Sequence, residues 1–571
     1  MMRILLLTHA FNSLAQRLFL ELRERGHELS VEFDINDATT AEAVELYTPD
    51  LVLAPYLRRA IPEAVWRAVP CFIVHPGPPG DRGPSALDWA ILNDVPRWGV
   101  TVLQATAELD GGPVWAAADF AMRQTRKSSL YRNEVTEAAV AAVIEALDRF
   151  RHGPGPVGGG TAGGHGWQPL VRQADRRIDW AHDGCAGILR KIRSADGQPG
   201  VEDEVLGLRC RLFDAWNEPR LAGRPGDVIA RRHDAICRAT RDGAVWIGQL
   251  QPIADGQRGF KRPAAAALGA LADALPRSEP APDTPADPQG YPDIRYEEEG
   301  PVGLLHFEFY NGAMSAAQCE RLRAAVRAAR ARPTRVIVLM GGHDFWSNGL
   351  HLHCIEAAPS PADASLRNIE AMDDLALEIL QADRQLTLAA LAGNAGAGGV
   401  FLALAADAVM ARRGVVLNPH YRNMGNLYGS EYWTYLLPRR LHGRAAALMQ
   451  DRLPLDADQA LQLGLIDAVA GPARAAFLAE VRASAHALAQ PEAFAARLAA
   501  KRARRAADEA ARPLARYRAE ELERMRLNFY GFDPSYHVAR YRFVNRTPQA
   551  WTPLYLARHR AQVPSVRRRR A

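Results

Sequence analysis

The sequence predicts an α/β multidomain protein, and three observations support this. The chain has 571 residues, which is too long for a single hydrophobic core. Two stretches rich in Gly and Pro, residues 151–166 and 276–290, are typical of linkers. In the segments before the first linker and after the second, short apolar runs alternate with amphipathic stretches, as strands and helices do in α/β domains. We therefore expect domains at residues 1–150, 167–275, 291–473 and 474–571.

Composition and charge exclude several classes of protein. Apolar residues make up 48% and charged residues 24%, as in ordinary globular proteins, and the net charge of +5 suits small anionic ligands without indicating nucleic acid. Six widely spaced cysteines without a CxxC pattern indicate free thiols in a reducing cytoplasm. Residues 386–411 are apolar but contain Asn394, Asp407 and clustered glycines. We expect a strand, a glycine loop and a buried helix there, and no interaction with a membrane.

The first segment alternates strands and helices. A helix is expected at 13–26, and strands are expected at 3–10, 28–33, 50–55 and 71–77. This alternation predicts a parallel, doubly wound sheet whose ligands bind beyond the carboxyl ends of the strands. No GxGxxG follows the first strand, so a dinucleotide-binding fold lacks its fingerprint.

His75 and Asp110 are the first candidate catalytic pair. His75 closes the strand CFIVHPG, and Asp110 lies in a DGG turn after the strand GVTVLQ. A single His beside a Pro-Gly turn is more often structural, but the joint pattern of HPG, RGP, GVT and DGGP is improbable by chance. The segments 49–62, 75–91 and 99–114 resemble the formyltransferases that use 10-formyl-tetrahydrofolate, which include methionyl-tRNA formyltransferase.

Residues 167–275 extend this resemblance to the small β-barrel domain of the same family, through RIDW (177–180), KIRSADGQPG (191–200) and KRP (261–263). Removing a formyl group from an amine passes through a tetrahedral oxyanion, and the amine leaves only when protonated. The resemblance implies that His75 stabilises the oxyanion or moves the proton, that Asp110 holds its imidazole, and that Arg82 and Gly83 bind the folate.

One departure from the family lies in this site. Ile73 stands in the cofactor-binding position where the family usually has an Asn that donates to the formyl carbonyl. The loss of one such donor costs on the order of a hundredfold in rate. Either another donor compensates, or the reaction differs from tRNA formylation; a folate-binding fold without turnover also stays open.

The third segment contains a second constellation. The stretches 343–356, 391–411 and 460–471 resemble the crotonase, or enoyl-CoA hydratase/isomerase, superfamily, whose domain is a ββα superhelix. The resemblance covers about 291–473 and implies that coenzyme A thioesters bind here. Backbone N–H groups of Leu350 and Gly398 would form the oxyanion hole, and Gly349 and Gly399 would let the backbone approach the ligand.

The side chains of this segment depart from the hydratases. The two acidic positions of hydratases fall near Phe401 and Tyr421, so hydration of an enoyl-CoA is not expected. The segment 417–440 offers other acid–base candidates, Tyr421 and Glu431, with His420 as a further acid–base or ligand-binding residue. Packing or surface roles remain open for each of the three. Tyr432, Trp433 and Tyr435 are expected in the core or a pocket wall.

A metal site is not expected. His351, His353 and Cys354 are close in sequence but lack a fourth ligand nearby, and the crotonase resemblance uses this loop for backbone donors. From residue 474 the pattern becomes helical, which predicts a helical C-terminal extension, and the terminal arginines 567–570 are expected to be a solvated tail.

The two halves together resemble the HypX/HoxX-type maturation factors of [NiFe]-hydrogenase. This resemblance implies an enzyme, a formyltransferase plus a formyl-CoA decarbonylase, that makes the carbon monoxide ligand from 10-formyl-tetrahydrofolate and coenzyme A. Hydrogenase maturation proteins would be its partners. Two alternatives remain: a formyltransferase that stops at formyl-CoA, and a non-catalytic one-carbon carrier or scaffold for hydrogenase assembly.

Overall fold

The structure, a computed structural model, describes residues 1–159, 166–254, 257–278, 290–291 and 293–561. Most of the expected second linker, part of the first, and the arginine tail lie outside these residues. The chain forms two compact units. The first comprises residues 1–230, 236–247 and 548–571, and the second comprises 231–235 and 248–547.

The first unit contains a mixed seven-stranded sheet in the order β2-β1-β3-β4-β6-β7-β8. Its strands are β1 (Arg3–Thr8), β2 (Glu28–Phe33), β3 (Leu51–Tyr56), β4 (Cys71–His75), β6 (Arg97–Gln104), β7 (Pro113–Ala121) and β8 (Gly158–Gly159). Strands β1 to β4 are parallel, as predicted. The predicted parallel pairing does not extend to β6, β7 and β8, which pair antiparallel. Because only residues 105–112 join β6 to β7, no crossover can return the chain for parallel pairing.

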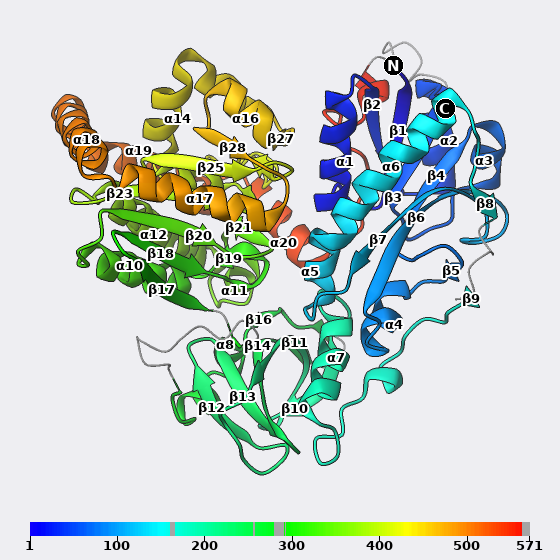
Figure 1. Ribbon diagram of the computed structural model, residues 1–571, viewed down its shortest axis with the longest axis horizontal. Coiled ribbons are helices and arrows are strands. Elements are labelled where there is room, and N and C mark those ends of the chain that lie inside the picture. The colour runs from blue at the N-terminus through cyan, green and yellow to red at the C-terminus, as the bar shows by residue number, and fades with distance from the viewer. Residues whose placement is uncertain (160–165, 255–256, 279–289, 292, 562–571) are drawn as a thin grey trace. The chain divides into compact units, whose positions relative to one another are not determined.

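Helices cover both faces of this sheet. Helices α1 (Ser13–Glu24) and α6 (Glu134–His152) lie on one face (Figure 1). Helices α2 (Asp37–Tyr47) and α3 (Glu63–Ala68) pack their apolar residues on the other face, against the alternate side chains of β1, β3 and β4. The described end of the chain returns to this unit, where Leu556 O accepts from the Val31 N–H of β2 at 3.0 Å.

The small domain is a sheet in the order β10-β11-β14-β13-β12, with α7 (Cys185–Ala195) packed on β11. Its strands are β10 (Val201–Val205), β11 (Leu208–Glu218), β12 (Val228–Arg232), β13 (Ala235–Thr240) and β14 (Gly243–Ala254). The division between the two compact units passes through β12 and β14. Closure of this sheet into a barrel stays a prediction.

The second unit has the ββα arrangement that the crotonase resemblance implies. Its main sheet, in the order β17-β18-β20-β23-β25-β28, is parallel from β18 onward. These strands are β17 (Ile294–Glu299), β18 (Val302–Phe307), β20 (Val336–Gly341), β23 (Leu386–Leu391), β25 (Ala408–Arg412) and β28 (Ala468–Ala470). A smaller sheet contains β21 (Phe345–Ser347), β24 (Asn394–Gly396), β26 (Val416–Asn418) and β27 (Leu455–Asp456).

Successive turns of the superhelix contribute one strand to each sheet and then a helix. Strands β20 and β21 lead to α12 (Pro361–Leu380), and strands β23 and β24 lead to α13 (Gly398–Leu404). The apolar stretch 386–411 is thus the predicted strand, glycine loop and buried helix. Within the described residues, every helix is too short or too polar to span a membrane.

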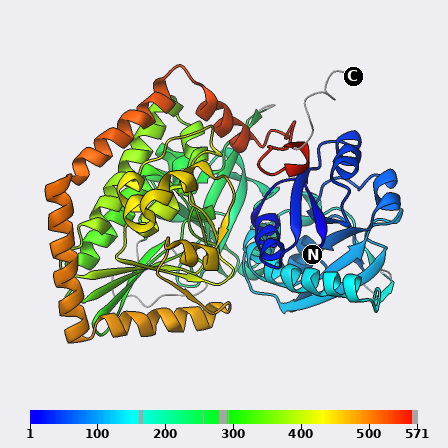
Figure 2. The ribbon, with the colours of Figure 1, turned by 90° about the horizontal axis from the view of Figure 1, so that it is seen from above.

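The helical extension is part of the second unit up to residue 547. It comprises α17 (Arg474–Leu488), α18 (Pro491–Ala511), α19 (Leu514–Tyr530) and α20 (Ser535–Asn545). Figure 2 shows α17, α18 and α19 following one another around the outside of this unit. Helix α19 packs on α12 and buries Leu522, Met525 and Phe529. The extension therefore completes the core around α12.

Two candidate active sites

His75 is the last residue of β4 and is only 5% exposed. Its Nε2 lies 2.8 Å from Asp81 Oδ2, and its Nδ1 lies 3.8 Å from Asp110 Oδ1. A Cβ at Gly77 would overlap both the imidazole and the Asp81 carboxylate, so only a glycine fits this turn. The structure thus brings His75 and Asp110 together, and it adds Asp81, which our sequence analysis missed.

Arg82 and Gly83 hold the turn that carries Asp110. Asp110 has a left-handed backbone conformation (φ 53°), and its Oδ2 accepts from the Gly83 N–H at 3.1 Å. The Arg82 guanidinium donates to Leu109 O at 2.9 and 3.2 Å and pairs with Glu108 at 2.7 Å. Arg82 and Gly83 therefore have a structural role, because they hold the turn of Asp110. That either of them binds folate stays a prediction.

Ile73 lies two residues before His75 in β4, on the same face of the sheet, and is half-buried. It pairs with Ala54 of β3 and Leu103 of β6. Its side chain has no polar atom, so it donates no hydrogen bond to a bound carbonyl. An imidazole with a carboxylate near each nitrogen can nevertheless hold a proton and transfer it to a leaving amine.

The second site is built where two glycines meet. Gly349 in β22 (Gly349–Leu350) is left-handed (φ 75°), and a Cβ there would lie 3.4 Å from Gly398 N. Gly398 is the first residue of α13, where the N–H groups find no acceptor within the helix. A Cβ at Gly399 would overlap Ser347 O, so this close packing also requires glycine. The segments of the two predicted backbone donors, Leu350 and Gly398, are therefore adjacent.

Glu431 brings a carboxylate to this point. It is fully buried, and a Cβ at Gly398 would overlap its Oε1. Oε1 has no hydrogen-bond partner among the described residues, whereas Oε2 accepts from the Tyr421 hydroxyl. The structure thus joins Tyr421 and Glu431, both predicted from sequence, beside the glycine pair.

The environment changes the protonation of both groups. Burial, together with the nearby Asp373 carboxylate, raises the pKa of Glu431 to about 8. Burial and the Glu431 carboxylate raise the pKa of Tyr421 well above its ordinary value. Tyr421 is therefore a neutral hydrogen-bond donor, and Glu431 can accept or release a proton near neutral pH, which suits a general acid or base.

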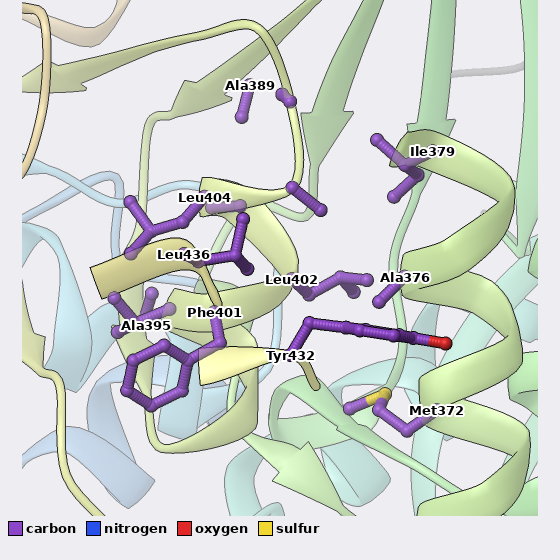
Figure 3. Close-up of a cluster of buried hydrophobic side chains, with 14 of the residues drawn as sticks. Met372, Ala376, Ile379, Ala389, Ala395, Phe401, Leu402, Leu404, Tyr432 and Leu436 are labelled. Carbon is purple, nitrogen blue, oxygen red and sulfur yellow. The ribbon is translucent and has the colours of Figure 1, made fainter. Parts of the chain in front are cut away.

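Apolar side chains surround this pair. The rings of Phe401 and Tyr421, at the two positions where hydratases have acids, stack with centroids 5.1 Å apart. Figure 3 shows Phe401 and Leu402 pointing to different sides of α13, and Tyr432 extending toward Met372 and Ala376 of α12. Tyr432 and Tyr435 are buried core residues, as predicted, and Trp433 packs partly buried against the same core.

The described contacts of His420 do not include Tyr421 or Glu431. It is buried, and burial lowers its pKa to about 4, so its ring is neutral at pH 7. The charged groups that act on it are Asp451 and Arg452. A ligand-binding or acid–base role for His420 stays a prediction.

The His351 loop has a structural explanation. His351 is the N-cap of α11 (Leu352–Glu356), and its Nδ1 accepts from the Cys354 N–H at 3.2 Å. Across the described parts of the chain, no group of three or more His, Cys, Asp or Glu side chains is arranged to hold a metal ion.

The side chains that support these two sites were not predicted from the sequence. Asp81 lies within the matched loop HPGPPGDRG, so its carboxylate could have been considered there. Asp373 in α12 and Glu521 in α19 contact the Glu431 loop from distant parts of the sequence, and no local motif marks them.

The segments that form the two sites are similar to known proteins. Family models match residues 13–147 (formyl transferase), 170–258 (formyl transferase, C-terminal domain) and 305–552 (enoyl-CoA hydratase/isomerase). Methionyl-tRNA formyltransferase of Stenotrophomonas maltophilia is 28% identical over 41% of this chain and 77% of its own length.

Two relatives are similar over almost the whole chain. Hydrogenase maturation factor HoxX of Bradyrhizobium diazoefficiens is 55% identical over 98% of this chain and 97% of its own. HypX from Aquifex aeolicus, whose crystal structure was solved in complex with tetrahydrofolic acid, is 48% identical in sequence, and its structure matches with a TM-score of 0.94. That match covers 98% of this chain and 99% of the other.

Proposed function

Because the chain belongs to the HypX/HoxX family of hydrogenase maturation factors, we propose that it makes the carbon monoxide ligand of a [NiFe]-hydrogenase in two steps. The first transfers a formyl group from 10-formyl-tetrahydrofolate to the thiol of coenzyme A. The second decarbonylates formyl-CoA to carbon monoxide and coenzyme A. The tetrahydrofolic acid in the HypX crystal structure supports folate as the donor, and the crotonase-type fold of the second unit supports a thioester.

His75 is the proposed proton carrier of the first step. The coenzyme A thiolate attacks the formyl carbon and gives a tetrahedral oxyanion. The C–N bond then breaks, and N10 of the folate leaves as a neutral amine after it receives a proton. An imidazole held between Asp81 and Asp110 can take the thiol proton and deliver it to that nitrogen.

Glu431 is the proposed base of the second step. A formyl thioester has no α-carbon, so enolate chemistry is impossible and the formyl hydrogen itself must leave as a proton. As it leaves, the C–S bond breaks and its electron pair goes to sulfur. The carbon keeps the electron pair of the C–H bond and departs in carbon monoxide, and the proton passes to the thiolate. The N–H groups of Leu350 and Gly398 would bind the formyl oxygen.

One observation carries this proposal: Glu431 Oε1 is a fully buried carboxylate oxygen that has no hydrogen-bond partner in the described part of the chain, and it is directed at Gly398 beside the predicted oxyanion hole. A buried polar atom without a partner is costly, so its retention favours a ligand that completes it. Tyr421 orients the other oxygen of the same carboxylate.

The experiment gives the purified protein 10-formyl-tetrahydrofolate and coenzyme A and measures carbon monoxide by the spectral shift of haemoglobin. We expect release only when both substrates are present. His75→Asn should lower release by about a thousandfold, as the loss of a general acid–base group does. Formyl-CoA added directly should restore release in His75→Asn but not in Glu431→Gln.

Other outcomes would favour the alternatives. No carbon monoxide above the control without coenzyme A would overturn the proposal. Formyl-CoA that accumulates without carbon monoxide would indicate a formyltransferase that stops at the thioester. Normal hydrogenase maturation in cells that carry only His75→Asn would indicate a carrier or scaffold that works with other maturation proteins.

A further inference from the structure

The backbone around Glu431 has an unusual conformation. Glu431 and Tyr432 are consecutive residues with left-handed backbone angles, φ 57° and 60°, although neither is a glycine. Such a conformation is unfavourable for residues with side chains and persists only where the surroundings impose it. The loop 430–434 must therefore be held by contacts beyond its own sequence.

Asp373 of α12 holds the first half of this loop. Its Oδ1 accepts from the Glu431 N–H at 2.8 Å, and its Oδ2 accepts from the Ser430 hydroxyl at 2.9 Å. Asp373 is fully buried, and the guanidinium of Arg518 approaches Oδ2 to 3.8 Å. One carboxylate thus fixes both the peptide N–H of Glu431 and the side chain before it.

Glu521 of α19 holds the second half. Its Oε2 accepts from the Tyr432 N–H at 2.9 Å, and its Oε1 accepts from the Thr434 N–H at 2.8 Å and from the Thr434 hydroxyl. Oε2 also lies 3.2 Å from the Ser430 hydroxyl. Glu521 is 1% exposed. Three donors from the Glu431 loop, together with the Ser430 hydroxyl, therefore converge on one side chain of the C-terminal extension.

Ser430 links the two carboxylates through one proton. Its hydroxyl contacts Asp373 Oδ2 and Glu521 Oε2 but has a single hydrogen to donate. Both contacts are separate, well-aligned hydrogen bonds only when one of the two carboxyl groups is protonated and donates to the serine. The arrangement therefore favours one proton shared between Asp373 and Glu521. The raised pKa values agree with this, since burial raises the pKa of Asp373 to about 7 and that of Glu521 to about 8.

We infer that Asp373 and Glu521 are positioning residues of the second site: they hold the loop 430–434 in its left-handed conformation and so keep the Glu431 carboxylate against Gly398. The inference rests on the proposed function, since it concerns the same carboxylate. It gives α19 of the helical extension a role in the reaction, because the loop and the helix meet through Glu521. Neither residue touches the reacting atoms.

The main test compares Glu521→Gln with Glu523→Gln, an equal change at an exposed position two residues further along α19. In Glu521→Gln, the NH₂ group of the glutamine would face the N–H of Tyr432 or that of Thr434. Two donors then face each other, so the hydrogen bonds at that atom are lost. A carboxylate misplaced by about 1 Å costs on the order of a hundredfold in rate. We expect kcat for carbon monoxide release from added formyl-CoA to fall about a hundredfold, with KM within about threefold.

The pH profile separates positioning from a merely structural role. The groups that face Glu431 are Tyr421, Asp373, Glu521 and Cys319, and the charge of Glu521 raises the pKa of Glu431. Because the pKa of Glu521 is itself raised to about 8, its negative charge appears in the same pH range in which Glu431 ionises. Glu521→Gln removes that charge, so the acid limb of the rate profile should move to lower pH. Formyl transfer from 10-formyl-tetrahydrofolate to coenzyme A, at the other site, should stay within about twofold of wild type.

The outcomes are distinguishable from failure of the proposed function. If wild type releases no carbon monoxide from formyl-CoA, the proposed function fails. If wild type releases it and Glu521→Gln has the same kcat and pH profile, the positioning inference is overturned. Should Glu521→Gln fail to fold, Thr434→Val decides in its place. This change removes only the hydroxyl contact to Glu521, and an unchanged kcat for it would overturn the inference.

Discussion

The two candidate sites differ in how the chain assembles them. The polar residues around His75 lie between positions 75 and 110, on the end of β4, the two-residue strand β5 (Asp81–Arg82) and the turn that carries Asp110. The residues around Glu431 lie between positions 319 and 521, on one strand, four helices and the loops that carry Tyr421 and Glu431. The first site is local in sequence, and the second depends on the folding of the whole unit.

The two sites also differ in electrostatics, and this difference matches their proposed chemistry. His75 lies between two carboxylates, which suits a group that takes a proton and delivers it within one reaction. Glu431 lies in a buried cluster of carboxylates, where burial and the Asp373 carboxylate raise its pKa to about 8. A base that must remove a weakly acidic formyl hydrogen needs such a raised pKa.

The largest expected effect on activity is at the first site, where substitutions of Asp81 and Asp110 should differ in size. Asp81→Asn removes the acceptor 2.8 Å from His75 Nε2 and should lower formyl transfer by about a thousandfold, within the range that acid–base groups contribute. Asp110→Asn removes a partner at 3.8 Å and should lower it by about a hundredfold. The measurement is formation of formyl-CoA from 10-formyl-tetrahydrofolate.

Carbon monoxide release from added formyl-CoA is the control in both variants and should be unchanged. An Asp110→Asn variant that loses more activity than Asp81→Asn would show that Asp110 is the principal partner of His75, as the sequence resemblance implied.

The sequence predicted the local site better than the assembled one. His75 and Asp110 were identified from HPG and DGG, but Asp81 was missed because a loop has no periodicity that shows which side chain turns back. Leu350 and Gly398 could be paired because glycines mark close backbone approach. Asp373 and Glu521 could not be found from the sequence. The pattern of an amphipathic helix predicts which positions are buried, but it does not predict which polar group a buried side chain contacts.

The same reasoning applies to the fold. The alternation of apolar runs predicted β1 to β4 and, of the helices between them, α1. It did not predict that β6 and β7 pair antiparallel, since the two-residue period of a strand contains no information on its direction. The short connection 105–112 was the available signal.

A smaller effect should come from Gly398→Ala in the assembled site. The new methyl group would overlap Glu431 Oε1, so the carboxylate must move away from the glycine pair. We expect carbon monoxide release from formyl-CoA to fall about thirtyfold, somewhat less than for a carboxylate misplaced by 1 Å, because the side chain can rotate.

Gly443→Ala is the matched control, because a Cβ there would meet no atom within 4 Å. Formyl transfer should be unaffected by either change. Equal rates for Gly398→Ala and Gly443→Ala would show that the position of Glu431 does not limit the reaction, and the contrast between the two sites would then be only structural.

The smallest effect concerns stability and pH. The pKa of Glu431 is raised to about 8 from an ordinary 4.5, so its carboxyl group binds a proton more tightly in the folded chain. This stabilisation is complete below about pH 4.5 and is lost as the pH rises through 8. Glu431→Gln cannot lose it, so between pH 5 and 8 the free energy of unfolding should fall by about 3.5 kcal/mol more in wild type than in the variant. Urea unfolding at several pH values measures this difference, with Glu523→Gln as the exposed control.

If the free energy of unfolding had the same pH dependence in all three proteins, Glu431 would already be ionised in the folded chain. The buried carboxylates would then orient Glu431 without raising its basicity.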